Sequence, residues 1–241
     1  YAENAIMNGV TFQLNSEVTG IEEKREFFKI ETCKHEYFKT HFIINSAGLY
    51  SDKISQMVGI NDYNVYPCRG QYVILDKKYA ELIRHLVYPV PPREIDVLGV
   101  HLTPTIEGSI LVGPTSEFIN DREGTNTTID TLHMIIKEAK KIMPSFPVKG
   151  IIRNFAGIRP KIAGKNQKGK ADFIIKESGK VENFIILAGI ESPGLTSATP
   201  IAYKVIQILS KKIKLVKKEN FNPYRKGIIR AYELPYEKKA K

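Results

Sequence analysis

The sequence of 241 residues contains only two cysteines, Cys33 and Cys68, and no His, Cys, Asp or Glu cluster has metal-ligand spacing. Two thiols in a chain of this size favour a reducing compartment over a disulfide scaffold. No apolar run reaches the roughly 18 residues that a membrane-spanning helix needs. The first residues, YAENAIMNGV, have neither a basic start nor an apolar core, so no secretory signal is visible. These absences predict a cytoplasmic protein without a metal site.

Negative charge is scarce at the C-terminal end. Residues 204–241 hold 12 Lys and Arg against 3 Asp and Glu, which is +9 of the total net charge of +10. A nucleic-acid-binding domain would more often carry its charge as a patch on a folded face, so we expect no nucleic-acid partner. The basic tail, 216–241, is interpreted as a solvated helix end and linker. Contact with an anionic membrane surface or with a protein partner is the alternative, so a peripheral membrane location stays open.

Strand-like and helical patterns alternate, which predicts a mixed α/β (α+β) fold. Residues 1–66 and 166–215 have the character of strand-to-helix units with glycine turns. Residues 67–165 have that of an antiparallel sheet, with one amphipathic helix over 127–143 that Pro144 ends. The pattern therefore predicts two lobes, the second inserted into the first.

The stretch ESPGLTSATPIA (Glu191–Ala202) joins a buried strand to a helix. A helix start offers unpaired N–H groups and a partial positive charge. Gly194 lets the backbone approach a ligand, and Thr196 or Ser197 can cap the helix. Pro200 fits only in the first turn, because further along it would break the hydrogen-bond ladder. The turn is either an ordinary connection or an anchor for partial negative charge, such as the O2/N1 edge of a reduced flavin.

Five stretches give this turn a context: INSAGLYSD (44–52), RGQYVIL (69–75), the run from YPVPP to LVGPT (88–115), FAGIRPK (155–161) and GIESPGLTSATPIA (189–202). In this order they resemble the D-amino-acid-oxidase-like family of FAD-dependent oxidoreductases. The most similar branch holds L-2-hydroxyglutarate dehydrogenases/oxidases and FAD-dependent glycerol-3-phosphate dehydrogenases. The resemblance implies FAD as cofactor. It also implies that the first lobe is part of a Rossmann-like FAD-binding lobe and that the inserted antiparallel sheet binds the substrate.

The family opens with a strand and a GxGxxG turn that holds the FAD pyrophosphate, and this sequence contains no GxGxxG. The chain is therefore expected to be a fragment of a longer flavoenzyme that lacks the N-terminal segment. The closing residues, NPYRKGIIRAYELPYEKKAK, resemble the run that precedes a cysteine-rich iron–sulfur domain in some clostridial-type members. An iron–sulfur partner is thus open, and so is the question of whether the chain holds FAD by itself.

Arg159, in FAGIRPK, is the first candidate for substrate binding. Pro160 disfavours the α region for Arg159 and holds it extended, so its guanidinium can offer two parallel donors to a carboxylate or phosphate. The resemblance implies a substrate-anion arginine at a comparable position. The alternative is a structural salt bridge. Arg69 is a second, weaker candidate.

His101 begins a predicted strand, where a neutral imidazole near the flavin could take the hydroxyl proton as hydride leaves the carbon. The alternative is a half-buried strand histidine. The resemblance implies that the segment with Ala47 and Gly48 passes near the ADP half of FAD. It places the flavin ring at the helix start, which contains Gly194, Leu195 and Thr196.

The sequence therefore predicts an enzyme that transfers a hydride to flavin from a small anionic alcohol. The alcohol is an L-2-hydroxy acid of the 2-hydroxyglutarate type or a polyol phosphate, glycerol 3-phosphate, and the electron acceptor stays open. An alternative of a different class is a non-catalytic, flavoenzyme-like binding module that acts through its basic tail.

Overall fold

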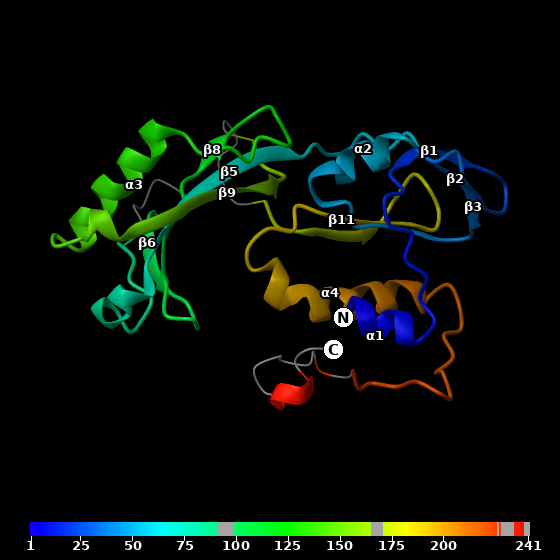
Figure 1. Ribbon diagram of the computed structural model, residues 1–241. Helices are drawn as coiled ribbons and strands as arrows, with labels where there is room; N and C mark the ends of the chain where they lie inside the picture. Colours follow the sequence, from blue (N-terminus) through cyan, green and yellow to red (C-terminus); the bar gives the residue numbers. More distant parts are fainter. Residues whose placement is uncertain (91–98, 165–170, 226, 228–233, 239–241) are drawn as a thin grey trace.

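The computed structural model describes residues 1–90, 99–164, 171–225, 227 and 234–238, and Figure 1 shows how they are arranged. Within these ranges three sheets are present, and together with the helices they give the mixed α/β fold that the sequence predicts. Parts of the stretch 88–115 and of the basic tail lie outside the described residues. No helix within these ranges is long and apolar enough to cross a membrane.

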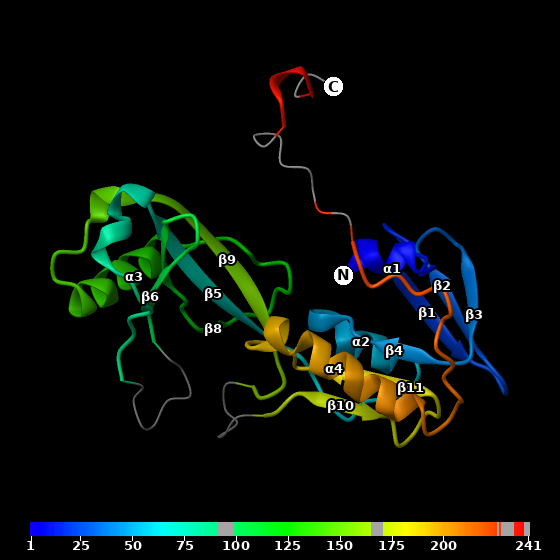
Figure 2. The same ribbon diagram turned by 90° about the horizontal axis from the view of Figure 1, so that it is seen from below.

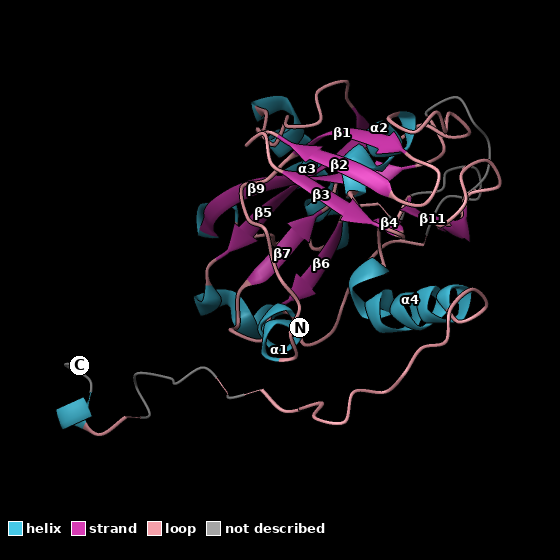
Figure 3. Cartoon of the chain, turned by 90° about the vertical axis from the view of Figure 1, so that its right-hand side faces the viewer, coloured by secondary structure: helices cyan, strands magenta, loops and turns pink. Residues whose placement is uncertain are grey.

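The first sheet is a three-stranded antiparallel meander of β1 (Val18–Glu23), β2 (Phe28–Thr32) and β3 (Tyr37–Thr40). Figure 3 shows it as a separate layer. Ile21 and Phe28 turn inward from it and pack against the neighbouring sheet. Residues 10–17, which lead into β1, lie outside any strand.

The second sheet has the order β10-β11-β4, from β10 (Ile174–Glu177), β11 (Phe184–Ala188) and β4 (Ile43–Asn45). β11 runs parallel to β4 and antiparallel to β10. Helix α2 (Ser51–Gln56) packs near one face and α4 (Gly194–Leu209) packs on the other, as Figure 1 shows; Figure 2 shows α4 lying across the sheet. All five residues of β11 are buried, which explains why its sequence is continuously apolar rather than alternating.

The third sheet is antiparallel and five-stranded. Its strands are β5 (Tyr66–Leu75), β6 (His101–Pro104), β7 (Ile110–Gly113), β8 (Glu117–Phe118) and β9 (Ile151–Lys161). The order is β6-β7-β5-β8, and β9 pairs with β5 along almost its whole length. Helix α3 (Ile129–Ile142), which the sequence predicts nearly to the residue, covers one face of this sheet (Figure 1).

Successive side chains of a strand point to opposite faces, so the register defines two sets of residues. One set packs under α3, where Val73, Leu102 and Val112 surround Ile135 and Ala139. The other set points away from α3. Its members, read off the pairing of β6, β7, β5 and β9, include His101, Gly113, Tyr72, Phe155, Gly70, Gly157, Cys68 and Arg159. We call this second side the open face.

The helix after β11 differs from the sequence expectation. Helix α4 begins at Gly194, so Pro200 is its seventh residue and lies beyond the first turn. The proline is exposed, and water can therefore satisfy the carbonyl of Thr196 that loses its N–H partner. No side chain caps the helix; the Thr196 hydroxyl instead donates to the carbonyl of Pro193 at 2.9 Å. The expected capping by Thr196 or Ser197 is wrong.

Part of the basic tail is bound rather than free. Asn8 follows helix α1 (Ala2–Met7) as its C-cap residue. Its side-chain amide donates to the carbonyl of Asn222 at 2.9 Å. Its side-chain oxygen accepts from the amide N–H of Asn222 at 2.8 Å. Arg225 forms an ion pair with Glu3 at 2.5 Å. Asn222 and Arg225 thus attach this part of the tail to α1, while residues 216–225 stay exposed to solvent.

The remaining elements are short 3-10 helices: η1 (Gly48–Tyr50), η2 (Lys77–Leu82), η3 (Val148–Gly150) and η5 (Tyr236–Lys238). η1 leads directly into α2.

Candidate functional site

Arg159 lies on the open face with one edge of its guanidinium held and the other free. Its Nη2 donates to the carbonyl of Thr115 at 2.7 Å, and its Nε lies 3.5 Å from the carbonyl of Cys68. Its Nη1 has no hydrogen-bond partner within the described residues. No carboxylate of the described ranges forms an ion pair with it. A half-buried cation that is oriented by carbonyls and keeps free N–H donors is suited to bind an anion.

Arg69 contrasts with Arg159 at every point. It is the next residue after Cys68, which faces Arg159, so it points to the opposite side of the sheet. Its Nε and Nη2 both donate to Glu117, at 3.1 and 2.8 Å, and its Nη1 donates to Asn126 Oδ1 at 2.7 Å. The residue is only 7% exposed. All three nitrogens are engaged, so the geometry favours a structural role for Arg69.

His101 lies on the open face at the start of β6, opposite Gly113 of β7. Its Nδ1 is 3.1 Å from the carbonyl oxygen of Gly99. A carbonyl oxygen only accepts hydrogen bonds, so in the neutral ring Nδ1 carries the hydrogen and Nε2 keeps its lone pair. The Tyr88 ring packs edge-on at 6.3 Å between centroids. His101 is thus oriented with Nε2 available as a proton acceptor.

The beginning of α4 meets the end of β9. Lys161, on the same side of β9 as Arg159, pairs with Glu191 at 2.8 Å. A Cβ on Gly194 would lie 2.5 Å from Ile190, so this position has no room for a side chain. The backbone N–H groups of Leu195 and Thr196 make no hydrogen bond within the described part of the chain, and Leu195 is 94% exposed. Two unpaired donors at a helix start are what an electron-rich ring edge requires.

Ala47 and Gly48 lie apart from this group, directly after β4. The Ala47 amide donates to Asn45 Oδ1 at 3.2 Å, and Gly48 has a φ of +56°, in the left-handed region that glycine tolerates. Ala47 lines a shallow groove with Asn45, Ser46 and residues of β1 to β3. The backbone can be approached closely here, which fits the expected position near the ADP half of FAD.

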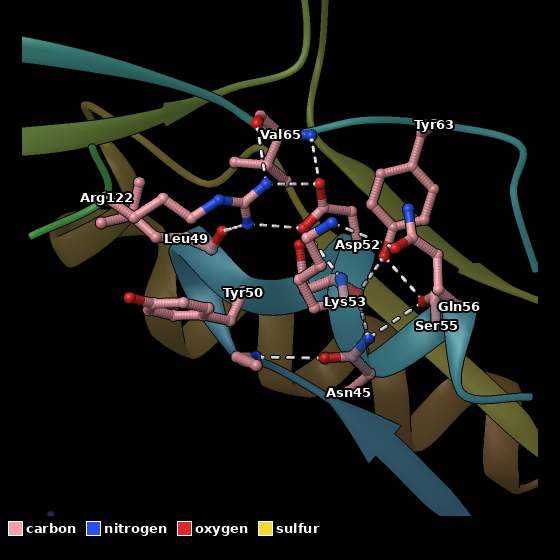
Figure 4. Close-up of polar contacts among 12 residues, drawn as sticks. Asn45, Leu49, Tyr50, Asp52, Lys53, Ser55, Gln56, Tyr63, Val65 and Arg122 are labelled. Atoms are coloured by element: carbon pink, nitrogen blue, oxygen red, sulfur yellow. Dashed lines mark hydrogen bonds and ion pairs between the residues drawn. The ribbon is translucent and has the colours of Figure 1, made fainter. Parts of the chain in front are cut away.

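A polar network that the sequence did not reveal connects the segment INSAGLYSD to the third sheet (Figure 4). Both nitrogens of the Arg122 guanidinium terminus donate to Asp52, each at 2.7 Å, and Arg122 also donates to the carbonyl of Leu49. Asp52 is 2% exposed and accepts from the amides of Val65 and Lys53 as well. Burial opposes its ionisation, but these donors outweigh burial and hold the pKa of Asp52 below its usual value.

Asn45 and Tyr63 complete the same network. Asn45 Nδ2 donates to the Ser51 carbonyl at 2.7 Å and to the Ser55 hydroxyl at 3.0 Å. The Tyr63 hydroxyl donates to the Ser51 carbonyl at 2.8 Å. The turn after β4 is therefore fixed from both sides. No three His, Cys, Asp or Glu side chains gather as metal ligands in the ranges that the structure describes.

An arginine with a free Nη1 and an oriented histidine lie on one sheet, and a helix start nearby keeps two free amides, which is an arrangement compatible with a flavin-dependent redox enzyme. The comparisons agree: the family model "FAD dependent oxidoreductase" matches residues 1–208. The chain belongs to this family, and the predicted resemblance and its FAD cofactor are confirmed at that level.

Three relatives illustrate the relationship. The chain is 41% identical over 239 residues to a glycerol 3-phosphate dehydrogenase of Caloramator mitchellensis, covering 99% of this chain and 48% of the relative. The L-2-hydroxyglutarate dehydrogenase of Homo sapiens is 26% identical, with 89% and 57% covered. The dithionite-reduced L-alpha-glycerophosphate oxidase of Mycoplasma pneumoniae, a structure with FAD bound, has a TM-score of 0.82 and 32% identity, with 95% and 58% covered. The chain thus spans about half the length of the curated relatives it matches.

Proposed function

We propose that this chain is the substrate-binding part, with some of the FAD-binding part, of a longer dehydrogenase or oxidase. The enzyme takes a hydride from the carbinol carbon of a small anionic alcohol. One observation carries the proposal: the free edge of Arg159 and the lone pair of His101 Nε2 lie on the same open face of one sheet. An anion and a hydroxyl of one substrate need these two partners.

The roles of the residues follow from their free groups. Arg159 Nη1 binds the substrate anion while Thr115 and Cys68 hold the rest of the guanidinium. His101 Nε2 accepts the hydroxyl proton. The amides of Leu195 and Thr196 would hold the O2/N1 edge of the isoalloxazine, and Ala47 and Gly48 would lie along the nucleotide. When FAD is bound it accepts the hydride.

Glycerol 3-phosphate is the substrate that we propose first, and an L-2-hydroxy acid of the 2-hydroxyglutarate type is second. The support for this order is similarity: the relative at 41% identity is a glycerol 3-phosphate dehydrogenase, and the L-2-hydroxyglutarate enzyme is at 26%. Both substrates combine an anion with a secondary alcohol, as the site requires. We also propose a cytoplasmic location, for which the two free thiols are the support.

The test uses the purified full-length protein with its flavin, mixed anaerobically with each alcohol while the flavin absorbance is recorded. Glycerol 3-phosphate is expected to bleach the flavin, and Arg159→Met is expected to abolish bleaching at the same substrate concentration. A flavin that neither glycerol 3-phosphate nor L-2-hydroxyglutarate reduces would contradict the proposal and favour a binding module without catalysis.

A further inference from the structure

Two glycines face each other in the middle of the open face. Gly70 of β5 pairs with Gly157 of β9, but the spaces above them differ. A Cβ on Gly70 would lie 3.2 Å from Pro114, 3.3 Å from the Thr115 carbonyl and 3.4 Å from Arg159 Nη2. A Cβ on Gly157 would have no atom of the described residues within 4 Å. The space above Gly70 is therefore filled, whereas the space above Gly157 is empty.

The empty space has a wall on each side along β9. Arg159 and Phe155 lie two residues away in the two directions and point to the same face. The Phe155 ring is stacked on Tyr72 of β5, with 5.0 Å between centroids and planes 1° apart. Residues four apart on a strand are separated by about 13 Å, so the walls leave room for a short carbon chain. We call this space, between Arg159 and the Tyr72–Phe155 pair, the Gly157 slot.

Neither backbone conformation nor packing explains a glycine at position 157. Its φ lies outside the left-handed range, so any residue could adopt this backbone. No described atom presses on it, although glycine within a strand is less stable than a residue with a side chain. Close approach of a ligand is the remaining physical reason for a glycine there.

Tyr72 is half-buried, whereas Phe155 and Gly157 are exposed, so the slot opens to solvent at β9. Burial raises the pKa of its phenol, and the positive charge of Arg159 acts in the opposite direction, so the two groups are close enough to interact. The Tyr72 hydroxyl has no hydrogen-bond partner among the residues that the structure describes. The far end of the slot is thus apolar with one free polar group.

We propose that Gly157 is a specificity-determining residue, because the slot above it takes the carbon chain of the substrate. The anionic group binds to Arg159 Nη1, and the other end of the chain meets the stacked rings of Tyr72 and Phe155. This proposal rests on the proposed function. It adds that the substrate is short and unbranched next to its anion, since the slot is one residue pair wide.

The experiment compares Gly157→Ala and Gly157→Val with the wild type in the full-length, flavin-loaded protein. Gly179→Ala is the matched control, because Gly179 also has an ordinary φ and nothing within 4 Å of its Cβ position, but lies between β10 and β11. One methyl group in a binding pocket changes kcat/KM by about 10–200-fold. Gly157→Ala should therefore lose about tenfold and Gly157→Val more, mainly through KM. Gly179→Ala should keep wild-type kinetics.

Two further measurements distinguish blocked substrate binding in the slot from a structural effect of the substitution. Flavin content and melting temperature should not fall in Gly157→Ala, because the added methyl group enters empty space. Inorganic phosphate, an anion without a carbon chain, should inhibit Gly157→Val as strongly as the wild type. Wild-type KM in Gly157→Val would overturn the proposal, and so would loss of flavin with a normal KM in the remaining holoenzyme. An inactive wild type would instead overturn the proposed function itself.

Discussion

The ion pair between Arg122 and Asp52 offers a direct test of how the third sheet is fixed to the segment after β4. Replacing Arg122 by Met removes both N–H donors from a carboxylate that is 2% exposed. Breaking a buried ion pair on one side costs about 3–5 kcal/mol. The backbone amides of Val65 and Lys53 still donate to Asp52. We therefore expect the free energy of unfolding to fall by an amount near the lower end of this range, about 3 kcal/mol.

The assay is urea unfolding of the full-length protein, with Lys141→Met as the control. Lys141 pairs with Glu138 at 2.6 Å on the surface of α3, and exposed pairs of this kind contribute only about 0–1 kcal/mol. The double variant Arg122→Met with Asp52→Asn should recover part of the loss, because the uncompensated charge is gone. Equal costs for Arg122→Met and Lys141→Met would refute the reasoning.

The same pair predicts a pH dependence. The folded-state pKa of Asp52 is depressed, so its contribution to stability is fully present above the unfolded pKa of about 3.9 and is lost as the pH falls through the folded value. The difference in stability between the wild type and Arg122→Met should therefore be largest above about pH 5 and should shrink as the solution is acidified. A difference that is constant from pH 7 to pH 3 would contradict this.

Four other predictions concern the site and the tail. Arg159→Lys keeps the charge but loses the planar fork, so kcat/KM should fall about thirtyfold or more with little change in melting temperature, since such a contact contributes roughly 2–5 kcal/mol. Arg69→Met should show the reverse pattern, with a clear fall in melting temperature and a small fall in kcat/KM. If both substitutions changed the melting temperature and kcat/KM alike, the distinction between the two arginines would be contradicted. His101→Gln should lower kcat by about 10²–10⁴-fold while flavin content stays constant, and an unchanged kcat would remove it as the proton acceptor. Truncation after Asn220 removes Asn222 and Arg225 from α1, so limited proteolysis should cut α1 faster while turnover is kept; loss of all turnover in a folded truncation would contradict this.

Local patterns in the sequence predicted the elements that local forces define. The apolar spacing over 127–143 and the stop at Pro144 predicted α3, which spans Ile129–Ile142. The apolar run before ESPG predicted β11, and Pro160 predicted an extended Arg159. These signals depend on hydrophobic period, backbone restriction and turn chemistry, all of which act within a few residues.

The contacts that the sequence did not reveal join residues far apart in the chain. Arg122 and Asp52 are 70 positions apart, and Asn8 and Asn222 are 214 positions apart. Arg122 stands in a polar segment with no motif around it, and a charged tail has the same composition whether it is bound or solvated. Pro200 was misplaced for a different reason: a cap at Thr196 or Ser197 would have put it in the first turn, but the helix already begins at Gly194.

The two arginines show how a structure separates a binding role from a structural role that a sequence leaves open. Both lie on paired strands, and either side chain could reach an anion. A guanidinium has five N–H donors, and its role depends on how many of them the fold already engages. Arg69 has all three nitrogens bonded, whereas Arg159 has its Nε and Nη2 near two carbonyls and an Nη1 with no partner among the described residues. An arginine held on one side and open on the other is already oriented before a ligand arrives, so binding the anion requires little further ordering of the side chain.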